Sequence, residues 1–257
     1  MEAIRVASKK LFFKDVQPAK GDPRATLVLI HGAGGSHLSW RRQFEDLSDV
    51  FRVIAVDLPG HGMSEGNGEV TITAYSRFVV ELMDMLDLEN VMLGGHSLGG
   101  AVALDVALTG SDRLSSLLLV GTGARLRVLP AIFSLIHEDF KLAIEGVANF
   151  VFSPHASPEI VSEEKQLLGK VSPDLLIKDF TACDSFDIMD RVGAINVPSL
   201  IACGKEDRLT PVKYSEYMHS RLANSEMVLF DSCGHMAMLE KSAEFNRCVS
   251  SFLAKLQ

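Results

Sequence analysis

The sequence has no long apolar run, and this absence bounds where the protein works. No stretch of ~18 uninterrupted apolar residues occurs, so we predict no membrane-spanning helix. The first residues, Met1-Glu2-Ala3-Ile4-Arg5-Val6, lack the basic start, apolar stretch and small-residue cleavage site of a signal peptide. We therefore expect a cytoplasmic protein with no membrane partner.

Cysteine is also sparse. The four cysteines, Cys183, Cys203, Cys233 and Cys248, are widely separated and form no Cys-x-x-Cys pair. This spacing argues against a disulfide framework and is typical of free buried thiols in a reducing compartment. The histidines lack the His-Glu-x-x-His spacing of zinc hydrolases and show no other paired ligand spacing, so we predict no metal ion.

An excess of positive charge is missing as well. The formal net charge is −8, which argues against nucleic acid as a partner. Two glycine-rich segments do not fit nucleotide-binding loops. Segment 32–35 lacks the third glycine of a dinucleotide-binding turn, and segment 94–100 lacks the Lys-Ser/Thr pair that holds phosphate and magnesium. We predict a small-molecule substrate and no cofactor, while the oligomeric state stays open.

The apolar runs that are present alternate with amphipathic stretches. Six short runs rich in Val, Ile and Leu are apolar on both faces, as expected of parallel strands buried between helices. They are residues 26–30, 52–56, 90–93, 116–120, 197–203 and 226–230. Helices are predicted at 71–86, 100–108, 212–222 and 243–256. This alternation predicts an α/β fold with a doubly wound, mostly parallel sheet.

Two regions fall outside this alternation. At the start, the closely spaced strands 3–7 and 11–16 predict an antiparallel hairpin at the sheet edge. Between residues 124 and 196 no clear strand occurs, and the stretch 130–152 has apolar residues at helical spacing. Helices inserted between two late strands are typical of a cap over the strand ends. We predict a core of residues 1–123 and 197–257, with 124–196 as a helical cap and not an independent domain.

Ser97 stands at the apex of a predicted strand–turn–helix. It is the centre of Gly94-Gly95-His96-Ser97-Leu98-Gly99-Gly100, which follows one apolar run and precedes another. Glycines two residues before and after the serine let the strand and the helix approach without Cβ clashes. Gly-x-Ser-x-Gly in this context is a nucleophile elbow, so we predict that Ser97 is a catalytic nucleophile.

A serine hydroxyl is a weak nucleophile, and it needs a base that is itself held by an acid. Asp207 follows the strand 197–203, and His235 follows the strand 226–230. Both side chains therefore lie at the carboxyl edge of the predicted sheet, where ligands of open α/β sheets bind. We predict His235 as the base and Asp207 as its partner, with Glu206 as the alternative acid.

A glycine-rich loop supplies the remaining part of the predicted site. His31-Gly32-Ala33-Gly34-Gly35 follows the strand 26–30 directly. Such a loop can turn backbone N–H groups inward and, with the N–H of Leu98 after the nucleophile, form an oxyanion hole. We predict Ala33 and Leu98 as the donors, with Gly34 as a possible alternative to Ala33.

Four segments of the chain resemble the α/β-hydrolase superfamily. They are His31-Gly32-Ala33-Gly34-Gly35-Ser36-His37-Leu38-Ser39-Trp40, Asp57-Leu58-Pro59-Gly60-His61-Gly62-Met63-Ser64, the elbow around Ser97, and the paired acid and histidine loops. The resemblance implies the α/β-hydrolase fold and a serine that attacks a carbonyl. It also implies that His235 acts as base and then acid while Asp207 orients it.

Three further histidines have structural interpretations. His31 is expected to hold the glycine-rich loop, and His61 to brace the Pro-Gly-His-Gly turn in which it lies. The alternation of side chains along a strand points His96 away from the pocket, which favours a packing role. We therefore do not count these three among the catalytic residues.

The substrate is less constrained than the fold. Haloalkane dehalogenases and epoxide hydrolases of this superfamily carry aspartate at the nucleophile position, so Ser97 argues against both. Carbon–carbon bond hydrolases typically carry tryptophan after the catalytic histidine, where this chain has Met236. We predict an esterase that cleaves a small or medium apolar carboxylic ester through an acyl-enzyme. Open alternatives are a carbon–carbon bond hydrolase, a thioesterase, and a non-catalytic ligand-binding relative.

Overall fold

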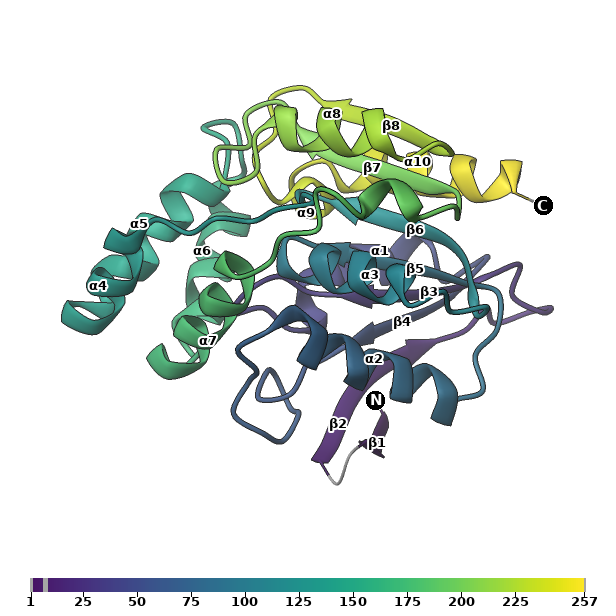
Figure 1. The fold of residues 1–257 in the computed structure, drawn as a ribbon, viewed down its shortest axis with the longest axis horizontal. Coiled ribbons are helices and arrows are strands. Elements are labelled where there is room, and N and C mark those ends of the chain that lie inside the picture. Colours follow the sequence, from purple (N-terminus) through teal and green to yellow (C-terminus); the bar gives the residue numbers. More distant parts are fainter. Residues whose placement is uncertain (1, 7–8, 257) are drawn as a thin grey trace.

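The computed structural model describes residues 2–6 and 9–256 (Figure 1). Its strands are β1 (Glu2–Val6), β2 (Lys9–Val16), β3 (Thr26–Ile30), β4 (Arg52–Val56), β5 (Val91–His96), β6 (Leu114–Val120), β7 (Ser199–Gly204) and β8 (Ser225–Phe230). Its α-helices are α1 (Arg41–Asp46), α2 (Ile72–Met85), α3 (Leu98–Leu108), α4 (Pro130–Glu138), α5 (Phe140–Val151), α6 (Pro158–Leu168), α7 (Pro173–Asp184), α8 (Val212–Arg221), α9 (Ala237–Glu240) and α10 (Ser242–Lys255). The 3-10 helices are η1 (His37–Trp40) and η2 (Val192–Ala194).

The strands form one sheet in the order β1-β2-β4-β3-β5-β6-β7-β8. The pairs from β4 to β8 are parallel, whereas β1–β2 and β2–β4 are antiparallel. The predicted doubly wound, mostly parallel sheet is confirmed, and so is the hairpin at its edge. Residue 7, the last of the predicted first strand, lies outside the described residues.

Each face of the sheet is covered by its own helices, because the inner strands are apolar on both sides. On β3, Val28 and Ile30 pack toward α2, α3 and α8, and Leu27 and Leu29 pack toward α1 and α10. Figure 1 shows α2, α3 and α8 in front of the sheet, with α1 and α10 behind it. The carboxyl ends of the parallel strands are thereby held rigidly between two apolar layers.

The helices α4–α7 all lie between β6 and β7, and we call them the helical insertion (left side of Figure 1). Within the described residues 124–196 there is no strand, only an isolated bridge between Arg125 and Asp187. The cap boundaries at 123/124 and 196/197 stay an interpretation.

The stretch 130–152 differs from the single helical stretch that its spacing predicts. It is broken at Asp139, whose extended backbone (φ −150°, ψ 90°) ends α4 and begins α5. The Asp139 carboxylate accepts a hydrogen bond from Leu142 N at 2.9 Å. The side chain therefore caps α5 and offsets the interruption of the helix.

Three other observations bear on the predictions from the sequence. The short elements η1 and α1 after the glycine-rich loop were not predicted, because six residues are too few for a clear helical period. In the part of the chain that the structure describes, no helix is long and apolar enough to cross a membrane. The four cysteines are free, and three of them are buried, as expected.

Candidate active site

Ser97 has the strained backbone that its position at the turn predicts. Its φ of 53° and ψ of −115° lie in a region that non-glycine residues rarely occupy. A Cβ on Gly95 would collide with the backbone of Gly99, and one on Gly99 would collide with Ile30 O and His31 O. Both glycines are thus required for the strand β5, the helix α3 and the end of β3 to meet at the serine.

His235 and Asp207 form a buried pair at the ends of β8 and β7. His235 Nδ1 lies 2.8 Å from Asp207 Oδ2, and the two residues are 3% and 4% exposed. Because the two ring nitrogens lie on different sides of the imidazole, this bond directs Nε2 away from the carboxylate. Burial by itself would raise the pKa of Asp207, but the charge and hydrogen bond of His235 and the bonds from Thr210 hold it below its usual value.

Two neighbours locate His235 near the turn that carries Ser97. A Cβ placed on Gly121, directly after β6, would lie 3.1 Å from His235 Nδ1. The ring of His96, the residue before Ser97, is centred 4.5 Å from the ring of His235, and His96 Nε2 lies 3.1 Å from His235 O. Burial lowers the pKa of His96 well below its usual value, so His96 is neutral. The sequence favours a packing role for it, and the residue against which it packs is His235.

The hydrogen bonds of Ser97 leave its hydroxyl available. Ser97 N donates to Val120 O at 2.9 Å, and Ser97 O accepts from Thr122 Oγ1 at 2.8 Å. Among the described residues, Ser97 Oγ itself makes no hydrogen bond. Bonds between nucleophile and base are often long in the absence of substrate and shorten when it binds.

The glycine-rich loop after β3 lies next to Ser97. A Cβ placed on Gly32 would lie 3.3 Å from Ser97 Cβ. Within residues 2–6 and 9–256, the N–H groups of Ala33 and Leu98 donate no hydrogen bond, whereas Gly34 N donates to Asp179 Oδ2 at 2.8 Å. The N–H of Gly34, the alternative donor of the sequence analysis, is therefore engaged elsewhere, and this favours Ala33.

His31 holds this loop, as the sequence indicates. Its Nε2 accepts from Leu58 N at 3.1 Å, so the ring proton lies on Nδ1, 2.8 Å from Gly32 O. Burial, together with the nearby charge of His61, lowers the pKa of His31 to about 4. A neutral imidazole therefore ties the loop after β3 to the loop after β4.

Two residues that support the pair were missed from the sequence. Thr210 donates from its hydroxyl to Asp207 Oδ2 at 2.8 Å and from its backbone to Oδ1 at 2.9 Å. Glu240 accepts from Gly234 N at 3.0 Å and from Met236 N at 3.2 Å, on either side of the histidine. Asp207-x-x-Thr210 is a local side-chain-to-backbone pattern that could have been recognised. The role of Glu240, by contrast, is visible only in the structure, where the loop around His235 folds onto its carboxylate.

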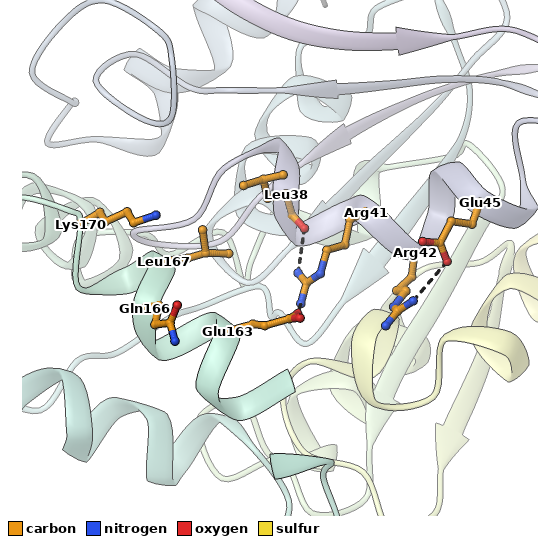
Figure 2. Close-up of a pocket in the computed structure, with 8 residues that line it drawn as sticks. All are labelled: Leu38, Arg41, Arg42, Glu45, Glu163, Gln166, Leu167 and Lys170. Carbon is orange, nitrogen blue, oxygen red and sulfur yellow. Dashed lines mark hydrogen bonds and ion pairs between the residues drawn. The ribbon is translucent and has the colours of Figure 1, made fainter. Parts of the chain in front are cut away.

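A surface pocket of about 390 Å³ lies between η1, α1 and α6 (Figure 2). It is lined by Leu38, Arg41, Arg42, Glu45, Glu163, Gln166, Leu167 and Lys170. Arg41 bridges the two sides through Glu163 at 2.9 Å and Glu164 at 2.6 Å. Neither Ser97 nor His235 lines this pocket, so it is an anchor between the core and the helical insertion and not the place of the reaction.

No metal site competes with this arrangement in the described part of the chain, where no group of three or more His, Cys, Asp or Glu side chains could hold an ion. The groups gathered at the strand ends are a hydroxyl, an imidazole–carboxylate pair and free backbone N–H groups. These are the parts needed for attack on a carbonyl and for stabilisation of the resulting oxyanion.

Residues 27–247 match the model of the alpha/beta hydrolase family, and the chain belongs to this family. It is 28% identical to the pimeloyl-[acyl-carrier protein] methyl ester esterase of Aliivibrio salmonicida, over 88% of this chain and 91% of that protein. It is 27% identical to the 2-hydroxy-6-oxononadienedioate/2-hydroxy-6-oxononatrienedioate hydrolase of Klebsiella pneumoniae, over 91% and 89% of the two chains. A solved structure described as a thermophilic esterase has a TM-score of 0.88 and 32% identity, covering 99% of this chain and 97% of the other.

Proposed function

We propose that this protein is a serine hydrolase that cleaves a small or medium apolar carboxylic ester through an acyl-enzyme. The observation that carries the proposal is the buried Asp207–His235 pair, 2.8 Å apart, beside a serine on a strained turn. A buried imidazole–carboxylate pair next to an accessible hydroxyl is the arrangement that activates serine. Backbone strain such as that of Ser97 clusters at functional positions.

In the first half of the proposed reaction, Ser97 Oγ attacks the ester carbonyl and His235 Nε2 takes its proton. Asp207 stabilises the imidazolium that forms, and the N–H groups of Ala33 and Leu98 bind the negative carbonyl oxygen. His235 then gives the proton to the leaving alkoxide, and the alcohol departs. In the second half, His235 takes a proton from the water that attacks the acyl carbonyl. It returns this proton to Ser97 Oγ as the bond between the acyl group and Ser97 breaks, and the carboxylic acid departs.

An apolar cluster in the helical insertion supports an apolar acyl group. Ile136, Ala143, Ile144 and Leu176 are buried together, and Ala33 packs against them from the glycine-rich loop. The predicted oxyanion donor thus has its side chain in contact with an aliphatic surface. A hydrocarbon chain beside the carbonyl would be desolvated there, which favours apolar over charged acyl groups.

The names of the relatives favour an ester among the possible bonds. The Aliivibrio relative is named as a methyl ester esterase, and the solved structure is described as an esterase. Thioesters and carbon–carbon bonds stay as alternatives, since the same attack on a carbonyl would cleave them. Activity on coenzyme A thioesters and on a vinylogous 1,5-diketone, measured beside esters, separates these substrate classes.

The direct test compares wild type with Ser97→Ala on nitrophenyl acetate, butyrate and octanoate. We expect wild type to hydrolyse at least one ester and Ser97→Ala to be slower by at least about a thousand-fold. Ser116→Ala is the matched control, because Ser116 is buried on β6 and its hydroxyl has no hydrogen-bond partner. Equal rates in wild type and Ser97→Ala would contradict the proposal.

A further inference from the structure

Asp179 on α7 is a fully buried carboxylate that the proposed reaction does not use. Its Oδ2 accepts hydrogen bonds from Gly34 N at 2.8 Å and from His61 Nε2 at 2.8 Å. Its Oδ1 accepts from the Tyr75 hydroxyl at 2.6 Å. One side chain of the helical insertion is therefore hydrogen-bonded to three segments of the core: the loop after β3, the loop after β4, and the beginning of α2.

The charge of this carboxylate is matched by His61. Burial by itself would lower the pKa of His61, but the charge and hydrogen bond of Asp179 raise it above its usual value. The neighbouring ring of His31, centred 4.7 Å away, is kept neutral. Asp179 thus favours the protonated form of His61 and has hydrogen-bond donors on both oxygens, the condition under which a buried charge is tolerated.

The bond to Gly34 has a consequence for the neighbouring peptide groups. The N–H of Gly34 belongs to the Ala33–Gly34 peptide, so Asp179 fixes the plane of that peptide. The next N–H toward the strand, that of Ala33, makes no hydrogen bond in the described part of the chain. A shift of the loop that turned Gly34 N–H inward would move Ala33 away from the position of the proposed donor.

We propose that Asp179 is a positioning residue of the oxyanion hole: its carboxylate holds Gly34 N–H, which leaves Ala33 N–H directed at the substrate and couples the seating of α7 to catalysis. This inference rests on the proposed function of the site. It gives the helical insertion a specific role. When α7 packs against the core, Asp179 orders the glycine-rich loop that binds the negatively charged carbonyl oxygen of the substrate. A donor that is already held in place before the reaction stabilises the transition state more strongly than one that must first be oriented.

The hydrogen bond can be observed directly in the full-length chain. Ala33-Gly34 is the only Ala-Gly pair in the sequence, so protein labelled with [13C-carbonyl]alanine and [15N]glycine has one carbonyl-coupled amide signal. We expect this Gly34 proton to be shifted downfield and to exchange slowly in wild type, because it is bonded to a buried carboxylate. A wild-type Gly34 proton that exchanges freely would overturn the inference without any variant.

Kinetics of Asp179→Asn and Tyr75→Phe then test the role. Asparagine is a weaker acceptor and cannot satisfy all three donors, so we expect kcat to fall by about ten-fold or more with little change in KM. Tyr75→Phe is the matched control, since it removes the donor to Oδ1 and leaves both bonds to Oδ2. We expect it to lower the melting temperature but to leave kcat and the Gly34 signal unchanged.

The rate of Ser97 phosphonylation by a fluorophosphonate separates this inference from the proposed function. Slower phosphonylation of Asp179→Asn than of Tyr75→Phe would support the inference, because the phosphonyl oxygen uses the same donors. Equal rates in folded Asp179→Asn and wild type would overturn only the inference. A wild type that is neither phosphonylated at Ser97 nor active on any ester would overturn the proposed function, and the inference with it.

Discussion

The helices α3 and α6 are both 11 residues long, yet they are buried to opposite extents. Eight residues of α3 are buried against the sheet, and no residue of α6 is buried. The helix α3 belongs to the core and begins directly after Ser97, whereas α6 belongs to the helical insertion. The core therefore holds the turn that carries Ser97 by close packing, and a residue there has little freedom to change.

The helical insertion is attached to the core in a different way. Its contacts include a few charged and backbone groups: Arg41 with Glu163 and Glu164, Asp179 with Gly34 and His61, and Val151 O with His235 N at 2.7 Å. Two of these three connections end on the loops of the proposed active site. The comparison teaches that close packing sets the site within the core, whereas the insertion meets the site loops through directional polar bonds in addition to apolar contacts.

The sharpest test of this contrast is one substitution made in both regions. Gly95→Ala places a Cβ against the Gly99 backbone, and we expect a loss of about 4 kcal/mol or more, enough to prevent folding. Gly146→Ala in α5 meets nothing within 4 Å, and we expect a gain of about 0.5 to 1 kcal/mol from helix propensity. Yield and thermal unfolding measure both. A well-folded Gly95→Ala protein would contradict the packing account of the core.

A second prediction compares two neighbouring acids. Asp207→Asn removes the acid that orients His235, so we expect kcat to fall by about a thousand-fold to ten-thousand-fold with the fold intact. Glu206→Gln changes a residue that faces His155 at 3.8 Å instead, and we expect turnover to stay the same. Ester hydrolysis under saturating substrate measures both. A larger loss in Glu206→Gln than in Asp207→Asn would exchange the roles of the two acids.

The ion pair between His61 and Asp179 predicts a pH-dependent difference in stability. Because the pKa of His61 is raised above its usual value of 6.5, the stabilisation is complete below pH 6.5 and is lost as the pH rises through the pKa of the folded state. The free energy of unfolding of wild type should therefore exceed that of His61→Gln by more at pH 6 than at pH 9. Urea unfolding at the two pH values measures this difference.

His219→Gln serves as its control, since the exposed His219 bonds to the Ser225 hydroxyl and not to a carboxylate. We expect the stability difference between wild type and this variant to be nearly the same at the two pH values. A gap between wild type and His61→Gln that widens as the pH rises would show that the charged His61 is not the stabilising form.

The smallest effect is expected at the surface anchor of Figure 2. Arg41→Ala removes ion pairs to Glu163 and Glu164, and we expect a loss of about 1 kcal/mol that shrinks in high salt. Arg42→Ala removes a more exposed pair with Glu45 and should cost less. Urea unfolding at low and high salt measures both. A larger loss in Arg42→Ala would contradict the role of Arg41 as the anchor.

The sequence predicts the core well because its signals are local. The runs that become β3, β5 and β7 are apolar on both faces, and the loop residues with chemistry follow them directly. Ser97, Asp207 and His235 therefore come to one sheet edge by the geometry of parallel strands alone. The strain at Ser97 can be predicted in the same way, because the turn is so tight that its flanking positions, Gly95 and Gly99, have no room for a Cβ.

The helical insertion is less predictable because its decisive contacts are long-range. Asp179 looks like any acid within a helix until α7 packs beside residues 34, 61 and 75, which are far away in the sequence. The break at Asp139 is hidden because the apolar spacing continues across it, and only the cap bond to Leu142 reveals it. Thr210 is intermediate in predictability. Its hydrogen bond to Asp207 is local in the sequence, but its role in supporting the pair depends on His235, which is distant in the sequence.

The most direct measurement for the central claim is mass spectrometry of the full chain after reaction with a fluorophosphonate. We expect one adduct per molecule, located on Ser97, and strongly slowed labelling in Asp207→Asn because His235 is then no longer held as a base. Labelling on another residue, or wild-type rates in Asp207→Asn, would contradict the account of a serine activated by the buried histidine–aspartate pair.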